Sequence, residues 1–173
     1  PASIDGAANN VGQHASLAVV GGHPAIAYHD VTNLDLKYVR ALDATGSTWG
    51  TPLTIDNGAT VGLYSSLKIV NGLPMIASQG VDNARYSCRL WRNLSADSTG
   101  AWSFVVLNLF VPQTNAGQRN SLAAINGAPA VSYIESSTGK LQYATVPDFA
   151  WTAGDGTVSP ILATAFGSPL AGD

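Results

Sequence analysis

The chain has 173 residues, of which 46% are hydrophobic and 11% charged, and its formal net charge is -3 at pH 7. This composition argues against a disordered segment, and eight Lys and Arg residues without a basic run argue against nucleic acid or an anionic membrane surface as a partner. No apolar run approaches the roughly 18 residues needed to span a bilayer, and the single cysteine, Cys88, excludes an intrachain disulfide.

Residues 1–15 are interpreted as a strand remnant followed by a loop. The first five residues, PASID, resemble PLTID at residues 52–56, which we expect to form the last strand of a later unit. The sequence therefore begins inside a repeat, as expected of a processed form or an excerpt of a longer chain. Its abundance of Gly, Ser, Thr and Asn is typical of secreted and cell-surface proteins, so we expect an extracellular or cell-surface location.

Residues 16–65 form the first complete unit. SLAVVGGHP at 16–24 predicts a strand and a Gly-Gly turn, and AIAY at 25–28 predicts a second strand. A third strand is predicted at 36–38, and a fourth follows Trp49 at 53–56. No helix is needed in this reading.

The opening motif of this unit occurs twice more, as SLKIVNGLP at 66–74 and SLAAINGAP at 121–129. These motifs define a second unit at 66–120 and a third at 121–173, with third strands predicted at 84–86 and 141–143 and a last strand at 160–164. Four antiparallel strands in about 50 residues describe a propeller blade. The predicted fold is therefore all-β, a single segment of three β-propeller blades.

The turns before the fourth strands carry a related pattern, DATGSTW at 43–49, DSTGAW at 97–102 and DFAW at 148–151. These residues resemble bacterial repeat propellers and the Asp-box, sialidase-like propeller group, although the first box has one extra residue and the third lacks the glycine. In that group the Asp accepts backbone hydrogen bonds and the Trp packs between sheets. The resemblance thus implies a fold rather than an activity.

Three blades are fewer than the 4 to 8 that typically close a propeller ring, so two interpretations are open. Either two copies of the chain form a six-bladed ring as a homo-oligomer, or the chain is part of a longer array. Both would cover the end faces that three blades leave exposed.

Candidate site residues lie in the longer loops that emerge on one face of the blades. The three units carry different residues at two places, two residues before each repeated serine and near the end of each second strand. The side chains at these positions are His14, His29, Asp30, Tyr64, Gln79, Arg119 and Glu135. Such variation fits one shared site near the axis, or simple drift of surface residues.

The candidate residues bear on three kinds of site: a glycosidase site, a metal site and a sialidase-like site. Asp30 and Glu135 are the carboxyls that a retaining glycosidase would need to bring together. His14 and His29 form a weak metal candidate, and the loop 30–35 a weak calcium candidate; we expect neither a metal nor a cofactor. A sialidase-like enzyme would require arginines from several blades, whereas Arg85, Arg89 and Arg92 belong to one unit.

Residues 90–96 are read as a long loop that departs from the repeat. Trp91 beside Arg92 is either an exposed partner interface or sugar platform, or a strand extension packed on a neighbouring blade. For Trp49, Trp102 and Trp151 the repeated position favours core packing.

The function expected from the sequence is a noncatalytic extracellular module for binding or surface assembly, with carbohydrate or another copy of the chain as its partner. The alternatives are a structural subunit without a small ligand and an Asp-box, sialidase-like glycoside hydrolase. On the binding interpretation, Asp30→Ala or Tyr64→Ala removes glycan binding without unfolding the chain.

Overall fold

The computed structural model describes residues 3–6, 9–82, 85–107 and 115–146, and these residues form an all-β structure. Within them no helix is long and apolar enough to cross a membrane. The strands are β1 (Val11–Val20), β2 (His23–Asp30), β3 (Asp35–Arg40), β4 (Leu53–Asp56), β5 (Leu63–Val70), β6 (Leu73–Asp82), β7 (Arg85–Asn93), β8 (Trp102–Val106), β9 (Gln118–Ile125), β10 (Ala128–Glu135) and β11 (Lys140–Thr145).

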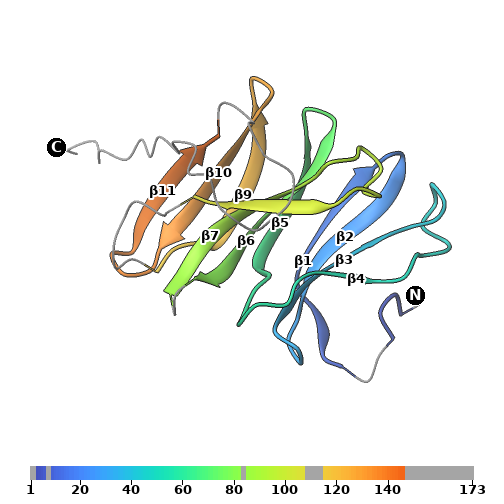
Figure 1. The fold of residues 1–173 in the computed structure, drawn as a ribbon, viewed down its shortest axis with the longest axis horizontal. Helices are drawn as coiled ribbons and strands as arrows, with labels where there is room; N and C mark the ends of the chain where they lie inside the picture. Colours follow the sequence, from blue (N-terminus) through green and yellow to red (C-terminus); the bar gives the residue numbers. More distant parts are fainter. Residues whose placement is uncertain (1–2, 7–8, 83–84, 108–114, 147–173) are drawn as a thin grey trace.

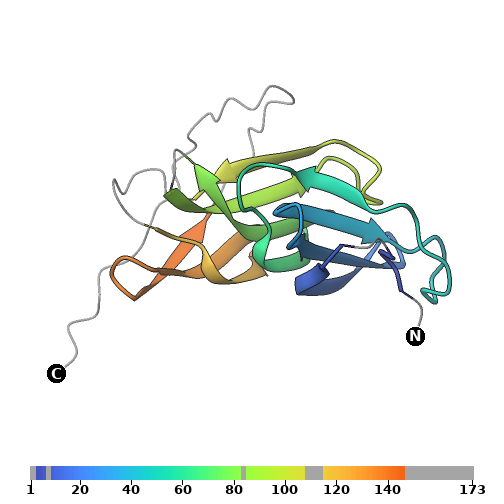
Figure 2. The same cartoon turned by 90° about the horizontal axis from the view of Figure 1, so that it is seen from below.

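Each predicted repeat forms one antiparallel sheet. Sheet 1 has the order β1-β2-β3-β4, sheet 2 the order β5-β6-β7-β8, and sheet 3 the order β11-β10-β9. Figures 1 and 2 show the three sheets side by side in chain order. The strand predicted at 160–164 lies outside the described residues. The three sheets are consistent with propeller blades.

The tight turns between first and second strands follow from their sequences. Asn71 and Gly72 have φ angles of 49° and 77°, and Asn126 and Gly127 have φ angles of 50° and 77°. Positive φ at both central residues is the requirement of the hairpin turn whose twist matches antiparallel strands, and Asn-Gly adopts it readily. Gly21 and Gly22 repeat this geometry in sheet 1.

The hydrophobic core consists of two clusters, one between each pair of neighbouring sheets. Between sheets 1 and 2 the buried side chains include Val20, Leu36, Leu67 and Trp91. Between sheets 2 and 3 the corresponding cluster consists of Val70, Met75, Ala77, Cys88, Leu90, Leu107, Ala116, Leu122, Val131, Tyr133, Ala144 and Val146. Sheet 2 therefore buries both faces, as the nearly continuous apolar runs of its first strands require.

Two predictions about strands are wrong. Residues 3–6, part of the predicted N-terminal strand, belong to no strand and lie against sheet 1 instead. The sequence aligned Tyr86 of the second unit with Tyr38 of the first. In the structure the β6–β7 hairpin is longer than the others, so Leu90 is opposite Ala77 as Tyr38 is opposite Ala27. The aromatic similarity between Tyr38 and Tyr86 had suggested the wrong alignment.

The two described Asp boxes stabilise their turns as the resemblance implies. Asp43 accepts hydrogen bonds from the backbone and hydroxyl groups of Thr45, Ser47 and Thr48, and these bonds hold the pKa of its carboxyl well below the ordinary value. Hydrogen bonds from Ser95 and Thr99 lower the pKa of Asp97 to about 2.

The tryptophans that follow these Asp boxes have structural contacts. Trp49 donates its indole N–H to the carbonyl of Gly46 at 2.9 Å, and Trp102 packs against Tyr38 with ring centroids 5.2 Å apart. The third box, at 148–151, lies outside the described residues.

Candidate functional site

The first strand of each sheet contains a β-bulge at the same repeat position. In β1, Gln13 is opposite His29 and Ser16 is opposite Ala27, so three steps on β1 face two on β2. The same one-residue excess occurs in β5 and in β9. Bulges re-aim side chains and are frequent next to functional sites.

Three of the seven candidate residues lie in these bulges. His14, Tyr64 and Arg119 each have a φ of 54°, in the left-handed region that L-residues with large side chains seldom adopt. A glycine stands two residues before each of them, also at positive φ. The sequence had placed the three in loops before the strands, whereas they lie within β1, β5 and β9.

Two of these glycines stand where neighbouring sheets meet closely. A Cβ on Gly62 would lie 2.8 Å from the Cα of Leu36 in sheet 1, and a Cβ on Gly117 would lie 2.8 Å from the carbonyl oxygen of Ser87 in sheet 2. Each glycine therefore lets a first strand approach the third strand of the preceding sheet. Tyr64 and Arg119 follow these close contacts by two residues.

Two of the three bulge side chains are in direct contact. The rings of His14 and Tyr64 have centroids 4.7 Å apart with an interplanar angle of 55°, and both residues are half-buried. Arg119 is exposed at the equivalent position of β9. Because β1 lies beside β5 and β5 beside β9, the three form a row across the sheets, which we call the first-strand row. Burial, and secondarily the charge of His29, lowers the pKa of His14.

His29 and Gln79 each link neighbouring sheets through a side-chain hydrogen bond. His29 is buried and its Nδ1 donates a hydrogen bond to the carbonyl of Val61 at 2.7 Å. Gln79, at the same repeat position, is also buried and donates from Nε2 to the carbonyl of Ala116 at 2.7 Å. Each bond ties a second strand to the residue before the glycine of the next sheet, so both side chains have an architectural role.

The two candidate carboxylates each stabilise their own hairpin. Asp30 is buried and accepts hydrogen bonds from the backbone N–H groups of Thr32 and Asn33 and from the Asn33 amide. Burial raises the pKa of Asp30, but these bonds and the Lys37 ammonium outweigh it and leave the pKa below the ordinary value.

Glu135 does the same in sheet 3, where it accepts from Ser137, Thr138 and Gln142. Because Asp30 and Glu135 both accept hydrogen bonds from their own hairpins, two interpretations of the site are weakened, the glycosidase site and the calcium site. The glycosidase reading needs carboxylates directed at a substrate, and a calcium site in the 30–35 loop needs the Asp30 oxygens that protein donors already occupy. Within the described residues no group of three His, Cys, Asp or Glu side chains is placed to hold a metal ion.

Trp91 and Arg92 lie within β7 and are buried, so the interpretation as an exposed loop is wrong. Trp91 belongs to the cluster between sheets 1 and 2 and stacks on Phe104 at a centroid distance of 4.4 Å. The alternative of a strand extension packed on a neighbouring sheet is confirmed.

The arginine cluster of a sialidase-like site is not favoured by the described residues. Arg89 forms an ion pair with Asp56, and Arg40 donates to the carbonyls of Val20 and Gly21. These guanidinium groups thus hold strands and turns together.

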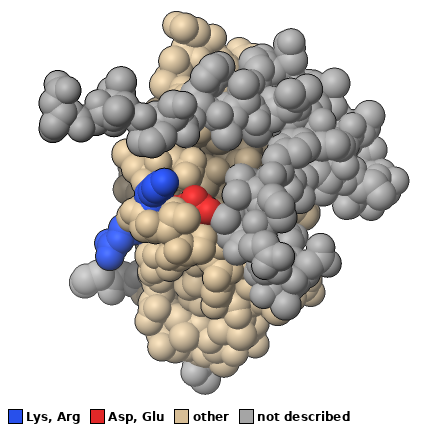
Figure 3. All heavy atoms as spheres, turned by 90° about the vertical axis from the view of Figure 1, so that its left-hand side faces the viewer, with Lys and Arg blue, Asp and Glu red and all other residues tan. Residues whose placement is uncertain are grey.

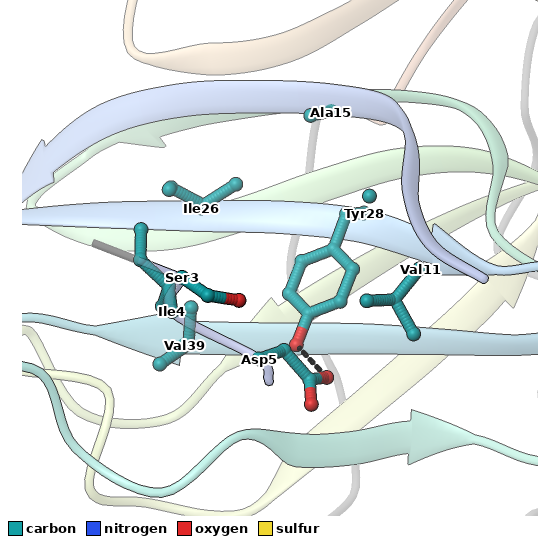
Figure 4. A pocket seen from close by; sticks show the side chains of 9 residues that line it. Ser3, Ile4, Asp5, Val11, Ala15, Ile26, Tyr28 and Val39 are labelled. Atoms are coloured by element: carbon teal, nitrogen blue, oxygen red, sulfur yellow. Dashed lines mark hydrogen bonds between the residues drawn. The ribbon is translucent and has the colours of Figure 1, made fainter. Parts of the chain in front are cut away.

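A hollow of about 260 Å³ lies on the outer face of sheet 1. Figure 4 shows Ile4 and Asp5 of the N-terminal segment lying across Ile26, Tyr28 and Val39 of that sheet, and the Tyr28 hydroxyl donates to Asp5 at 2.7 Å. Burial, and then the bond to Asp5, raises the pKa of Tyr28. The lining is mostly apolar, and its Tyr28 hydroxyl and Asp5 carboxylate are already bonded to each other.

No protein-family model and no curated protein sequence matches the chain. Among solved structures, the chain is similar to the crystal structure of an α-L-arabinofuranosidase from Lactobacillus brevis, with a TM-score of 0.59 and 10% sequence identity. The similarity covers 80% of this chain and 50% of that enzyme, so the chain spans half of the neighbour's length. At this identity the likeness concerns the fold, an all-β arrangement of antiparallel sheets.

Proposed function

We propose that the three sheets are β-propeller blades of an extracellular, noncatalytic carbohydrate-binding module, with the first-strand row of His14, Tyr64 and Arg119 as the binding platform. The observation that carries this proposal is the threefold bulge, which gives three chemically different side chains the same unusual backbone conformation. Strained residues of this kind persist where the surrounding structure holds them, and they are frequent at binding sites.

The chemistry of the row suits a sugar. Tyr64 offers an aromatic face for the C–H groups of a pyranose or furanose ring, together with a hydroxyl. His14, with its lowered pKa, is expected to be neutral at pH 7 and to both donate and accept hydrogen bonds. Arg119 provides several N–H donors for hydroxyl oxygens or for the carboxylate of an acidic sugar.

A noncatalytic role is supported by the state of the carboxylates. Glycoside hydrolysis normally requires two carboxyl groups flanking the scissile bond. Asp30 and Glu135, the pair considered from the sequence, are committed to hairpin hydrogen bonds. The structural neighbour is named as an arabinofuranosidase, which makes carbohydrate a reasonable ligand class while leaving hydrolysis unsupported here.

The test is binding of the full chain to an array of neutral and uronic-acid oligosaccharides, followed by titration calorimetry with the best binder. Tyr64→Ala and Arg119→Ala are each expected to weaken binding about ten-fold or more. Tyr86→Ala is the matched control, because Tyr86 is exposed at the start of β7 and lies outside the row.

Thermal unfolding of each variant separates lost binding from lost fold. Binding that persists in both row variants would overturn the platform, and an array without any binder would favour the structural-subunit alternative. Asp30→Ala is a poor test of binding, because Asp30 is buried and caps its own hairpin.

A further inference from the structure

The three sheets pack in series through one repeated interface. In each interface the earlier sheet contributes what we call its rear face and the later sheet its front face. Leu67 of sheet 2 and Leu122 of sheet 3 belong to front faces, and both are fully buried against the preceding sheet, at 0% and 1% exposure. Val20 of sheet 1 and Val70 of sheet 2 belong to rear faces and are 0% exposed.

The front face of sheet 1 is the same surface without a covering sheet. Leu17, which is opposite Ile26 as Leu67 is opposite Ile76, is 64% exposed. The backbone at Gly12 is likewise uncovered, because a Cβ on Gly12 would meet nothing within 4 Å. At the same position of sheets 2 and 3, a Cβ on Gly62 or Gly117 would collide with the preceding sheet.

The rear face of sheet 3 shows the converse. Leu141 is 75% exposed, whereas Leu36 and Cys88, at the same position of sheets 1 and 2, are 0% exposed. Ile125 is 46% exposed where Val20 and Val70 are buried. Figure 3 views the molecule from this end, and the described surface there is largely uncharged.

A hydrogen bond marks the register of each internal interface. Ser16 Oγ accepts from the backbone N–H of Leu67 at 2.9 Å, and Ser66 Oγ accepts from the backbone N–H of Leu122 at 3.0 Å. The repeated serine thus points to the repeated leucine of the next sheet. At the two ends of the chain the same donor and acceptor positions recur, the exposed Ser121 on sheet 3 as the acceptor position and the backbone N–H of Leu17 on sheet 1 as the donor position.

We infer that the front face of sheet 1 docks on the rear face of sheet 3 of a second copy of this chain, and that two copies close head to tail. The argument is continuity with the internal interfaces, since both end faces repeat surfaces that already bury each other twice. Two chains of three sheets give six, within the usual range of propeller blades, and closure satisfies both end faces of both chains.

One internal contact is not reproduced in the end interface. Sheet 3 has Ile134 where His29 and Gln79 donate to the next sheet, and its counterpart across the end interface would be Val11. The docked copies therefore replace a polar link with an apolar contact. The N-terminal segment already lies over Tyr28 and Val39, so docking centres on the first strands and on Leu17.

The experiment is native mass spectrometry and sedimentation of the full chain between about 1 and 100 μM. The wild type is expected at twice the 17.8 kDa chain mass. Leu17→Asp and Leu141→Asp place an unpaired charge in the interface and are each expected to raise the dissociation constant about 100-fold or more. Leu42→Asp is the matched control, because Leu42 is 65% exposed in the β3–β4 connection, outside both faces.

Mixing the two variants tests the head-to-tail pairing itself. A dimer of one Leu17→Asp chain and one Leu141→Asp chain has one interface with both charges and one fully wild-type interface. The mixture is therefore expected to associate more tightly than either variant alone. A single-chain mass for the wild type, an assembly indifferent to both substitutions, or a mixture no tighter than its components would each overturn the inference. Glycan binding by the monomeric variants is measured separately, since the substituted residues Leu17 and Leu141 are not members of the first-strand row.

Discussion

Gly12 and Gly62 occupy the same position in two repeats but have different surroundings. Both have positive φ, at 94° and 82°, so replacement by alanine strains the backbone at either site by about 1–2 kcal/mol. Only Gly62 also has the Cα of Leu36 within 2.8 Å of its missing Cβ. Comparing alanine substitutions at the two glycines therefore separates the energetic cost of backbone strain from the cost of overpacking between sheets.

Gly62→Ala is expected to lower the free energy of unfolding by about 2–5 kcal/mol, because overpacking adds to the strain. Gly12→Ala is expected to cost only the strain, about 1–2 kcal/mol. Urea unfolding of the two variants at a concentration where the chain is monomeric measures the difference. Equal losses would mean that the sheets separate easily at Gly62 and that the contact has little energetic weight.

The Asp-box turns are the elements whose stability should depend on pH. The pKa of Asp97 falls from an ordinary 3.8 to about 2 in the folded chain, owing to hydrogen bonds from Ser95 and Thr99. A lowered folded-state pKa stabilises the fold fully above the unfolded value and loses that contribution as pH falls through the folded value. The window for Asp97 is thus about pH 4 down to pH 2.

Asp97→Asn removes this titrating group while retaining its size. The urea midpoint of wild type should exceed that of Asp97→Asn at pH 5, and the gap should narrow as pH is lowered from 4 to 2. Solvent screening keeps the effect small, because the turn is exposed. A gap that is constant over this range would show that the hydrogen bonds do not depend on the charge of Asp97.

Several structural features were readable from the sequence at the level of elements. The repeated SLxxxxGxP motif predicted three sheets, and the Asn-Gly turns predicted their hairpins, because both signals are local. The hairpin role of Asp30 has a local signal too, since an Asp side chain at the start of a turn commonly accepts from the backbone N–H two residues later.

The rest depended on contacts between repeats. A glycine stands two residues before both His14 and Tyr64, but a glycine does not by itself show that the second residue after it has a positive φ. His29 and Gln79 each donate to a backbone carbonyl more than 30 residues away in the sequence. Because any side-chain donor can make this bond, the two repeats carry different residues there. The difference suggested a ligand site, whereas the structure shows that both residues make the same link between sheets.

At the scale of the whole molecule, the inferred pairing makes stability a function of concentration. A partner that binds only folded chains raises the free energy of unfolding in proportion to the logarithm of its free concentration relative to the dissociation constant. The melting temperature of the wild type is therefore expected to rise between about 1 and 100 μM, whereas that of Leu17→Asp should stay constant. Calorimetry or near-ultraviolet circular dichroism measures both series, with Leu42→Asp following the wild type. A wild-type melting temperature independent of concentration would mean that exposed Leu17 and Leu141 contribute nothing to stability in solution, despite their buried counterparts in the internal interfaces.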